Sequence, residues 1–525
     1  MSHLDEIARR RTFGIISHPD AGKTTLTEKL LLFGGAIQVA GAVKAKKASR
    51  YVTSDFMEIE KQRGISVATS VMGFEYQNLK INLLDTPGHQ DFCEDTYRTL
   101  TAVDSVLMVI DATKGVEEQT YKLLDVCRMR NTPVMTLMNK LDREVLDPID
   151  LLDEVEKKLK MPVCPMTWPI GMGKTFKGVY NLFEKRLVLF KPHAKKDEEA
   201  VEISSLEDPR LVSLLGESMA RSLIEDVALI SGVYPPFCQE TYLAGKLSPV
   251  FFGSAVNNFG VQALLDCFVR FSPHPRGRQT DQRMVSPEDP KFSGFIFKIH
   301  ANLDPKHRDR IAFLRICSGQ FERNKRYLHV RTGKGVKSAN PTAFMAQEKS
   351  VIDVAYPGDI IGLHDTGIFK IGDALTDGEI LTFKGIPSFS PEIFKGVINQ
   401  DPMKAKQLAK GLEQLCEEGV AQLFVREMDQ KKIMGTVGQL QFEVIQYRLE
   451  HEYGAKCRFE ELSYVKACWL TAEDPKLMVE FFQTRQSHLA KDKEGHTVYL
   501  AQTRWSLERE IRENPKITFH FTSET

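Results

Sequence analysis

The first half of the chain holds several short apolar runs of the kind that form buried strands. They lie at residues 12–16, 82–84, 134–138 and 249–252, with polar segments between them. Helical periodicity follows the first run, over residues 24–33. Buried strands that are linked in this way by helices predict an α/β domain with a mostly parallel sheet.

The hydrophobic pattern changes in the second half of the chain. Short runs in which apolar and polar positions alternate, such as 295–299 and 311–316, predict an all-β barrel. Farther along, helical and strand patterns mix. Residues 403–418 read as a helix, and a second helix opens at Gly438. This mixture predicts an α+β domain at the end of the chain.

Composition marks the boundaries between these parts. A segment rich in proline, arginine and polar residues follows the first part and reads as a linker. The 525 residues are enough for about three domains with substantial cores. We therefore expect a first domain at 1–275 with an insertion near 160–248, a linker at 276–290, a β-barrel domain at 291–385 and an α+β domain at 386–525.

A candidate phosphate-binding loop (P-loop) joins the first apolar run to the helix that follows. Its residues are Ser17, His18, Pro19, Asp20, Ala21, Gly22, Lys23, Thr24 and Thr25. Backbone N–H groups of such a loop surround an anion at the positive end of the helix, and Gly22 lets the chain pass close to it. We expect Lys23 to reach the β- and γ-phosphates and Thr24 to ligate Mg²⁺. Ser17 replaces the usual first glycine.

A second candidate element follows the run at 82–84 and predicts a nucleotide-sensing switch. Its residues are Asp85, Thr86, Pro87, Gly88 and His89. Asp85 leaves the carboxyl end of a strand, where open α/β sheets bind ligands, and we expect it to hold Mg²⁺ through water. The Gly88 amide is expected on the γ-phosphate of GTP, and His89 beside the attacking water.

The base of the nucleotide is predicted by two further elements. Residues Asn139, Lys140, Leu141 and Asp142 follow the run at 134–138, and Gly253, Ser254 and Ala255 follow the run at 249–252. The Asp142 carboxylate can accept hydrogen bonds from guanine N1–H and the 2-amino group, a paired donor edge that adenine lacks. Four elements in this order therefore indicate a guanine-nucleotide switch that takes GTP or GDP with Mg²⁺.

Ser66 and a second Gly-Lys-Thr are weaker signals. Ser66 offers a second hydroxyl for Mg²⁺, which would complete a metal site of Thr24, Ser66 and Asp85; an ordinary loop serine is the alternative. The Gly-Lys-Thr at residues 173–175 has Trp168 at the first-glycine position and no clear strand before it. We read this second occurrence as a loop without a nucleotide role.

The composition limits the remaining possibilities. Lys and Arg total 70, as do Asp and Glu, so bulk positive charge cannot be what attracts RNA. Nine cysteines without Cys-x-x-Cys spacing indicate neither a zinc ribbon nor a disulfide framework. No apolar signal core and no run of about 18 apolar residues are present, so we expect a cytoplasmic protein outside any membrane.

The motifs resemble those of the translational GTPases, which include elongation factor G. Within that family the chain is most similar to the bacterial peptide chain release factor 3 group. The segments that carry the resemblance are residues 18–24, 63–66, 85–89, 97–104, 168–171 and 304–310. The resemblance covers nearly the whole chain and is weakest in the final sixty or so residues.

The resemblance implies a P-loop GTPase domain followed by a β-barrel and an α+β domain. It implies GTP hydrolysis that is slow until ribosomal RNA docks at the switch, with Pro19 and Ile65 as an apolar gate in front of His89. Dissociation and recycling of the stop-codon-reading release factor after peptide release would be the output. The implied partners are the ribosome and these release factors, with no DNA, no membrane and a monomeric state.

Partner surfaces are less clearly marked. Two basic groups are candidates for ribosomal RNA phosphates, and solvated charged loops are the alternative. They are Lys44, Lys46, Lys47 and Arg50, and Lys306, His307, Arg308 and Arg310. Trp469 and Trp505 are expected in the core rather than on a partner surface.

Other readings remain for comparison. A translocase such as elongation factor G carries further domains, for which we expect 525 residues to be too short. A small-molecule kinase with the same phosphate loop is disfavoured, because residues 139–142 specify guanine and residues 85–89 form a switch rather than an acceptor site. A GTP-binding assembly module with incidental hydrolysis is a third reading, which substitution of His89 tests.

Overall fold

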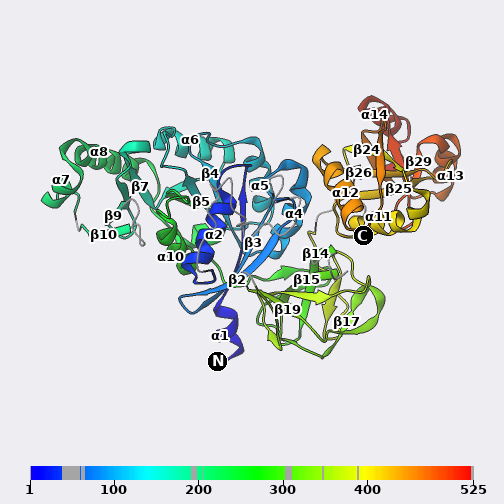
Figure 1. Ribbon diagram of the computed structural model, residues 1–525, viewed down its shortest axis with the longest axis horizontal. Coiled ribbons are helices and arrows are strands. Elements are labelled where there is room, and N and C mark those ends of the chain that lie inside the picture. Colours follow the sequence, from blue (N-terminus) through cyan, green and yellow to red (C-terminus); the bar gives the residue numbers. More distant parts are fainter. Residues whose placement is uncertain are drawn as a thin grey trace.

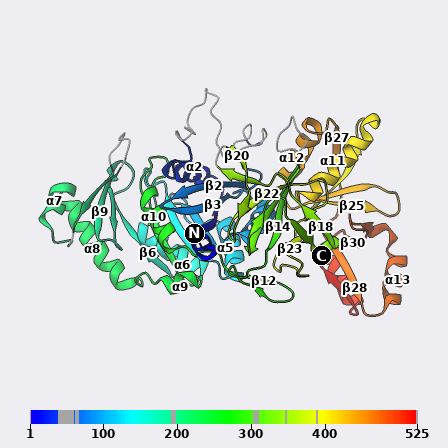
Figure 2. The same ribbon diagram turned by 90° about the horizontal axis from the view of Figure 1, so that it is seen from below.

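The structure is a computed structural model that describes residues 2–37, 60, 66–190, 198–203, 205–301, 310–345, 348–386 and 390–521. Figure 1 shows a central sheet, a small sheet with helices at its left, a β-rich part at its lower right and the C-terminal part at its upper right. Figure 2 shows the same elongated arrangement after a quarter turn.

A mostly parallel sheet forms the centre of the N-terminal half. Its strand order is β2 (Ser70–Tyr76), β3 (Leu79–Asp85), β1 (Arg10–Ser17), β4 (Ser105–Asp111), β5 (Val134–Asn139), β11 (Ser248–Phe252) and β6 (Val163–Pro165). Only the β2–β3 pair of this group is antiparallel. The four apolar runs form β1, β3, β5 and β11, which confirms the predicted α/β class.

Helices cover both faces of this sheet. Helices α2 (Lys23–Phe33) and α10 (Val261–Phe271) pack on one face; α4 (Cys93–Ala102), α5 (Glu118–Met129) and α6 (Pro148–Leu159) pack on the other. Successive residues of β4 illustrate the division, because Leu107 joins the core under α2 whereas Met108 joins the core under α5. Because helices cover both faces of the sheet, a ligand can bind at the edge where the strands have their carboxyl ends.

A small antiparallel sheet lies beside the central one, at the left of Figure 1. Its strands are β7 (Thr167–Ile170), β8 (Gly178–Asn181), β9 (Arg186–Phe190) and β10 (Glu198–Glu202). Helices α7 (Pro209–Leu215), α8 (Glu217–Val233) and α9 (Gln239–Leu243) follow before the chain returns to the central sheet at β11.

Antiparallel strands form the next part of the chain, as predicted. Its long pair is β14 (Ser293–Ala301) with β15 (Arg310–Ser318), and a core that includes Phe292 and Leu314 lies beneath it. The other strands are β12 (Arg278–Gln279), β13 (Met284–Val285), β16 (Phe321–Glu322), β17 (Arg326–His329), β18 (Lys334–Lys337), β19 (Thr342–Met345), β20 (Glu348–Val351), β21 (Val354–Ala355), β22 (Ile360–His364) and β23 (Ala374–Thr376).

The C-terminal part combines an antiparallel sheet with helices, again as predicted. The strand order is β27 (Cys457–Glu461), β24 (Ile393–Asn399), β26 (Lys432–Thr436), β25 (Gln422–Arg426), β29 (Leu489–Lys491), β30 (Thr497–Ala501), β28 (Lys466–Ala472) and β31 (Ile517–His520). The helices are α11 (Ala405–Glu417), α12 (Gln439–His451), α13 (Pro475–Thr484) and α14 (Arg504–Glu513). Helices α11 and α12 are the two that the sequence predicts.

Contacts between distant segments join these parts. Strand β19 pairs with β2, where Met345 lies opposite Gly73. Helix α4 packs against β14, and the turn before α4 packs against α12. The N-terminal helix α1 (His3–Ala8) lies beside Tyr356 through His3. Among the described residues, no helix is both long and apolar enough to span a membrane.

Candidate nucleotide-binding site

The phosphate-loop candidate is a tight turn between β1 and α2. Gly22 caps α2 with a left-handed φ of 94°, a conformation that favours glycine. A Cβ at Gly22 would also overlap the Asn139 amide, whose Nδ2 donates to the Ala21 carbonyl at 2.8 Å. Asp20 is left-handed too, with φ 65°. The loop therefore leaves the first N–H groups of α2 at the carboxyl edge of the sheet, where an anion is favoured.

Lys23 and Asp85 meet at the centre of this edge. Lys23 Nζ forms an ion pair with Asp85 Oδ1, and both side chains are buried. The other oxygen, Asp85 Oδ2, is buried without a hydrogen-bond partner among the described residues. This carboxylate oxygen and the half-buried Thr24, which follows Lys23 directly in the chain, are of the kind that a hydrated Mg²⁺ prefers, because the ion takes oxygen ligands.

The switch candidate lies against the phosphate loop. Thr86 Oγ1 donates to the Ile15 carbonyl at 2.7 Å, which ties the start of the switch to β1. A Cβ on Gly88 would lie 3.4 Å from the His18 carbonyl oxygen, so the Gly88 backbone passes close to the loop. His89 caps the short 3-10 helix η1 (Gln90–Phe92) and has a half-exposed side chain.

The two predicted base-recognition elements are in direct contact. Ser254 Oγ donates to Asp142 Oδ1 at 2.6 Å, and the Ala255 N–H donates to Asn139 Oδ1 at 2.9 Å. The Leu141 N–H donates to the Gly253 carbonyl at 3.2 Å. Parallel strands β5 and β11 thus hold two segments side by side that are more than a hundred residues apart in the chain.

Asp111 is a residue that the sequence analysis missed. Lys140 Nζ lies 2.6 Å from Asp111 Oδ2, and Thr113 donates to Oδ1. Burial raises the pKa of Asp111, but the hydrogen bonds from Lys140 and Thr113 outweigh it and hold the pKa below its ordinary value. The sequence does contain a signal for Asp111, because this residue ends the apolar run of β4 just as Asp85 ends the run of β3.

His18 is a buried, uncharged part of the loop. Its Nδ1 lies 3.5 Å from Thr120 Oγ1, and Glu117 is 3.9 Å from Nε2. Burial lowers the pKa of His18 more than the nearby carboxylates raise it. The imidazole therefore adds no positive charge to the loop near neutral pH.

The weaker signals of the sequence fall in three kinds of segment. Ser66 is half-buried in the segment before β2, where the next residue, Val67, donates its N–H to Glu60 at 2.8 Å. The second Gly-Lys-Thr forms a 3-10 turn, η2 (Gly173–Thr175), between antiparallel strands β7 and β8. Residues 38–59, 61–65 and 302–309, with Ile65, the first basic group and most of the second, are outside the described residues.

Two predictions are wrong: that Arg310 is available to RNA phosphates, and that Trp505 lies in the core. Arg310 is buried, with Nε 2.5 Å from Asp365 and a further ion pair to Glu417, so these carboxylates neutralise it and no RNA phosphate can reach it. Trp505 is 68% exposed, because α14 turns Leu507 into the core and residue 505 lies on the opposite side of the helix. Trp469 is buried, as predicted, and donates to Asp492.

Comparison with known proteins defines the class of this protein. The profile of the elongation factor Tu GTP-binding domain matches residues 8–274, half of the chain, which therefore belongs to the translational GTPase family. Elongation factor G domain 2 matches residues 291–378. The C-terminal domain of the class II release factor RF3 matches residues 383–510 and places the chain in the release factor 3 branch. It is a GTP-hydrolysing enzyme that binds guanine nucleotide and interacts with the ribosome.

A solved structure has the same fold. The chain is similar to a crystal structure of a protein from Thermus thermophilus, with a TM-score of 0.70 and 22% sequence identity. The similarity covers 89% of this chain and 71% of that one. At this level of identity the likeness concerns the fold alone.

Proposed function

We propose that this protein is a ribosome-dependent GTPase that promotes dissociation and recycling of the stop-codon-reading release factor after peptide release. The observation that carries the proposal is the contact between the switch region and the part matched by the release factor C-terminal domain. Arg98 of α4 donates to the Gly419 carbonyl at 2.8 Å, and the Leu440 N–H donates to Asp91 at 2.7 Å. A change at the γ-phosphate can therefore move the C-terminal part.

The chemistry that we assign to the site uses the residues gathered at the edge of the central sheet. Lys23 and the loop amides hold the phosphates, Asp142 reads guanine, and Gly88 senses the γ-phosphate. His89 orients the attacking water. Thr24, Ser66 and Asp85 would hold Mg²⁺, which neutralises charge that develops on the phosphates.

Several finer points belong to the same proposal. The stop-codon-reading release factors are the protein partners, and the protein acts as a monomer in the cytoplasm. We divide the chain into a GTP-binding domain at 1–275 with its insertion, a linker at 276–290, a barrel at 291–385 and a C-terminal domain at 386–525. The separate sheet of the C-terminal part supports the last boundary, whereas the barrel strands continue the central sheet through the β2–β19 pair.

The test follows a fluorescent stop-codon-reading release factor on terminated ribosomes. Its dissociation rate is measured with and without this protein, using GTP, GDP and a non-hydrolysable GTP analogue. A large acceleration that requires GTP supports the proposal. If GTP turnover is ribosome-stimulated and the release factor leaves at its own rate, the enzyme acts at another step of translation and the proposal fails.

A further inference from the structure

The His89 side chain is directed toward the turn that follows it in the chain. The Asp91 N–H donates to His89 Nδ1 at 3.2 Å, and Asp91 Oδ1 lies 3.3 Å from the same nitrogen. The Phe92 ring is 6.1 Å away, centroid to centroid. Within the part of the chain that the structure describes, these are the hydrogen-bonding, charge and ring contacts of His89. The position of the 90–92 turn therefore decides where the imidazole lies.

The same Asp91 carboxylate reaches across to the C-terminal part. Its Oδ2 accepts the N–H of Leu440, the second residue of α12, at 2.7 Å. The first N–H groups of a helix have no partner within the helix, and its positive end favours a carboxylate. The N-cap position of α12 is Gly438, which has no side chain for this purpose. Asp91 thus caps a helix from a position 349 residues away in the chain.

Gly438 makes this contact possible. A Cβ at this position would overlap the Asp91 carboxyl group. The φ of Gly438 is −133°, in the extended region that any residue adopts, so the backbone itself does not require glycine. The absent side chain therefore serves the contact with Asp91 and not the local fold of α12.

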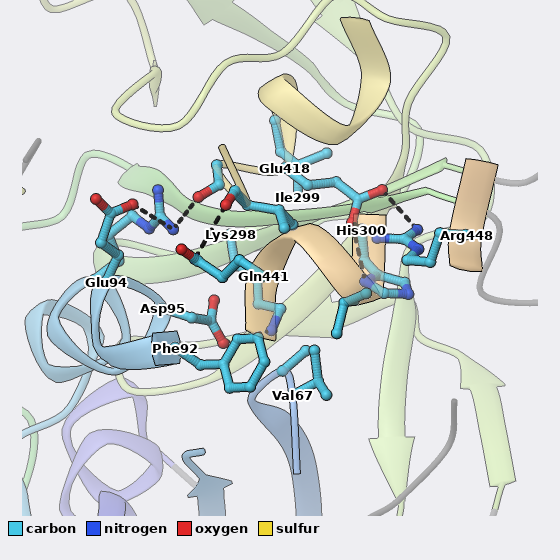
Figure 3. A pocket seen from close by; sticks show the side chains of 15 residues that line it. Val67, Phe92, Glu94, Asp95, Lys298, Ile299, His300, Glu418, Gln441 and Arg448 are labelled. Atoms are coloured by element: carbon cyan, nitrogen blue, oxygen red, sulfur yellow. Dashed lines mark hydrogen bonds and ion pairs between the residues drawn. The ribbon is translucent and has the colours of Figure 1, made fainter. Parts of the chain in front are cut away.

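The turn is also held from its apolar side. Phe92 packs with Val67 and with Val444 of α12 in a small buried cluster. Beside it, a cavity of about 30 Å³ lies where α4, β14 and α12 meet (Figure 3). Figure 3 shows Phe92 and Val67 below this cavity and Gln441 and Arg448 of α12 on its other walls. An interface with a void is less tightly packed than a protein core, so it can part at lower cost.

We infer that Asp91 is a positioning residue for His89 and that α12 sets its position. While the C-terminal part is docked, the Leu440 N–H and the space at Gly438 fix the Asp91 carboxylate, and Asp91 keeps the imidazole at the 90–92 turn. Separation of α12 releases Asp91, and the imidazole is then free to orient water over the phosphate loop. The docked C-terminal domain thus restrains GTP hydrolysis. This inference rests on the proposed role of His89.

The first test is Gly438→Ala, which places a methyl group where Asp91 docks. Single-turnover GTP hydrolysis is measured without ribosomes, and GTP and GDP affinities are measured separately. We expect the hydrolysis rate to rise roughly tenfold, within the usual range of coupling between sites, while nucleotide affinity stays within about twofold. Gly232→Ala is the matched control, because a Cβ on this glycine of α8 would meet open space. The hydrolysis rate of this variant should equal that of the wild type.

A second set of variants approaches the contact from Asp91. Asp91→Ala should raise the rate to a similar extent, and Asp91→Asn should stay near the wild type, because an amide oxygen still accepts the Leu440 N–H. The Asp91→Ala, Gly438→Ala double variant should be no faster than either single one, since all remove one contact. The inference is overturned if the gains of the two single variants multiply in the double variant. It is also overturned if Gly438→Ala hydrolyses GTP at the wild-type rate or more slowly.

One further variant separates this inference from the proposed function. Adding His89→Ala to Gly438→Ala should abolish the gain; a gain that persists shows that the restraint does not act through His89 and overturns the inference. None of these measurements contains a ribosome or a release factor. If these hydrolysis measurements contradict the inference, the release-factor proposal is therefore unaffected. If the dissociation assay contradicts that proposal, the hydrolysis measurements still test the role of Asp91.

Discussion

The carboxylate of Asp104 lies 2.5 Å from the guanidinium of Arg315, and both side chains are buried. Asp104 directly precedes β4 of the central sheet, whereas Arg315 lies on β15 of the barrel part. The other Asp104 oxygen accepts from Arg278 at 2.9 Å and from the Arg276 N–H at 3.1 Å. One carboxylate thus joins the first two parts and the segment between them.

Loss of this carboxylate should destabilise the protein strongly. Asp104→Ala leaves buried arginines without their partner, and breaking a buried ion pair costs about 3–5 kcal/mol. We expect the midpoint of urea unfolding of the N-terminal two-thirds to fall accordingly. Lys157→Ala is the control, because Lys157 is exposed and pairs with exposed Asp153 at the surface; the midpoint of this variant should not change. Equal midpoints for both variants would contradict the joining role of Asp104.

His89→Ala should reduce catalysis without weakening nucleotide binding. A group that positions or polarises the attacking water typically contributes about 10²–10⁴-fold to the rate. We expect a loss of that order in ribosome-stimulated turnover, with GTP and GDP affinities unchanged. Rapid-mixing hydrolysis assays with saturating ribosomes measure it. Turnover at the original rate would remove His89 from the mechanism and favour a role in which hydrolysis is incidental.

Asp142→Asn should change the base that the enzyme accepts. The carboxylate offers two acceptors to guanine N1–H and the 2-amino group, whereas an amide presents a donor to one of them. Hydrogen bonds to charged groups are worth about 1.5–3 kcal/mol each, so we expect the loss of one to lower GTP affinity by about ten- to a hundredfold. Xanthosine triphosphate, with an oxygen in place of the 2-amino group, should bind the variant better than GTP does. Fluorescence titrations with both nucleotides decide the matter.

A smaller loss is expected for Ser254→Ala in the same titrations. Ser254 Oγ only holds Asp142 Oδ1, at 2.6 Å, so its removal leaves both acceptors available to the base. The preference for guanine over xanthine should persist in this variant. If Ser254→Ala also came to prefer xanthine over guanine, the side chain of Asp142 would not be the group that contacts the base.

Glu94 should make stability depend on pH near neutrality. Burial raises the pKa of Glu94 to about 7 from its ordinary 4.5, although Arg98, 4.0 Å away, opposes the shift. Between these values the folded protein keeps a proton that the unfolded chain has lost. The free energy of unfolding therefore falls as pH rises through this window, by at most about 1.4 kcal/mol per pH unit from this group.

Urea unfolding at several pH values from 5 to 7.5 measures this effect. Glu94→Gln should flatten the slope relative to the wild type, because the amide does not titrate. The neighbouring Asp95 should not contribute in this range: burial raises its pKa, but Lys298 and Arg98 bring it down to about 2. Glu225→Gln, on the exposed side of α8, should keep the wild-type slope. Identical slopes for all three proteins would show that Glu94 is not protonated in the folded state.

The sequence by itself determined the elements that bear the candidate site. Strands β1, β3, β5 and β11 appear where the apolar runs predict them, and α2 begins at Lys23 directly after Gly22. Local signals suffice here, because burial of a strand, the left-handed turn at Gly22 and the start of a helix depend on neighbouring residues. The order of the elements then brings residues 139–142 and 253–255 to the same sheet edge.

Only the tertiary structure decided which charged and polar groups meet across the chain. The residues near Asp91 in the sequence do not predict its hydrogen bond to the N-terminus of α12. Those near Arg310 do not predict its ion pair with Glu417. These partners lie between 100 and 350 residues apart, and their pairing follows from how whole elements pack. Hydrophobic patterning fixes which face of an element is buried, but not which distant element covers it. The link from His89 to the C-terminal domain therefore belongs to the tertiary structure alone.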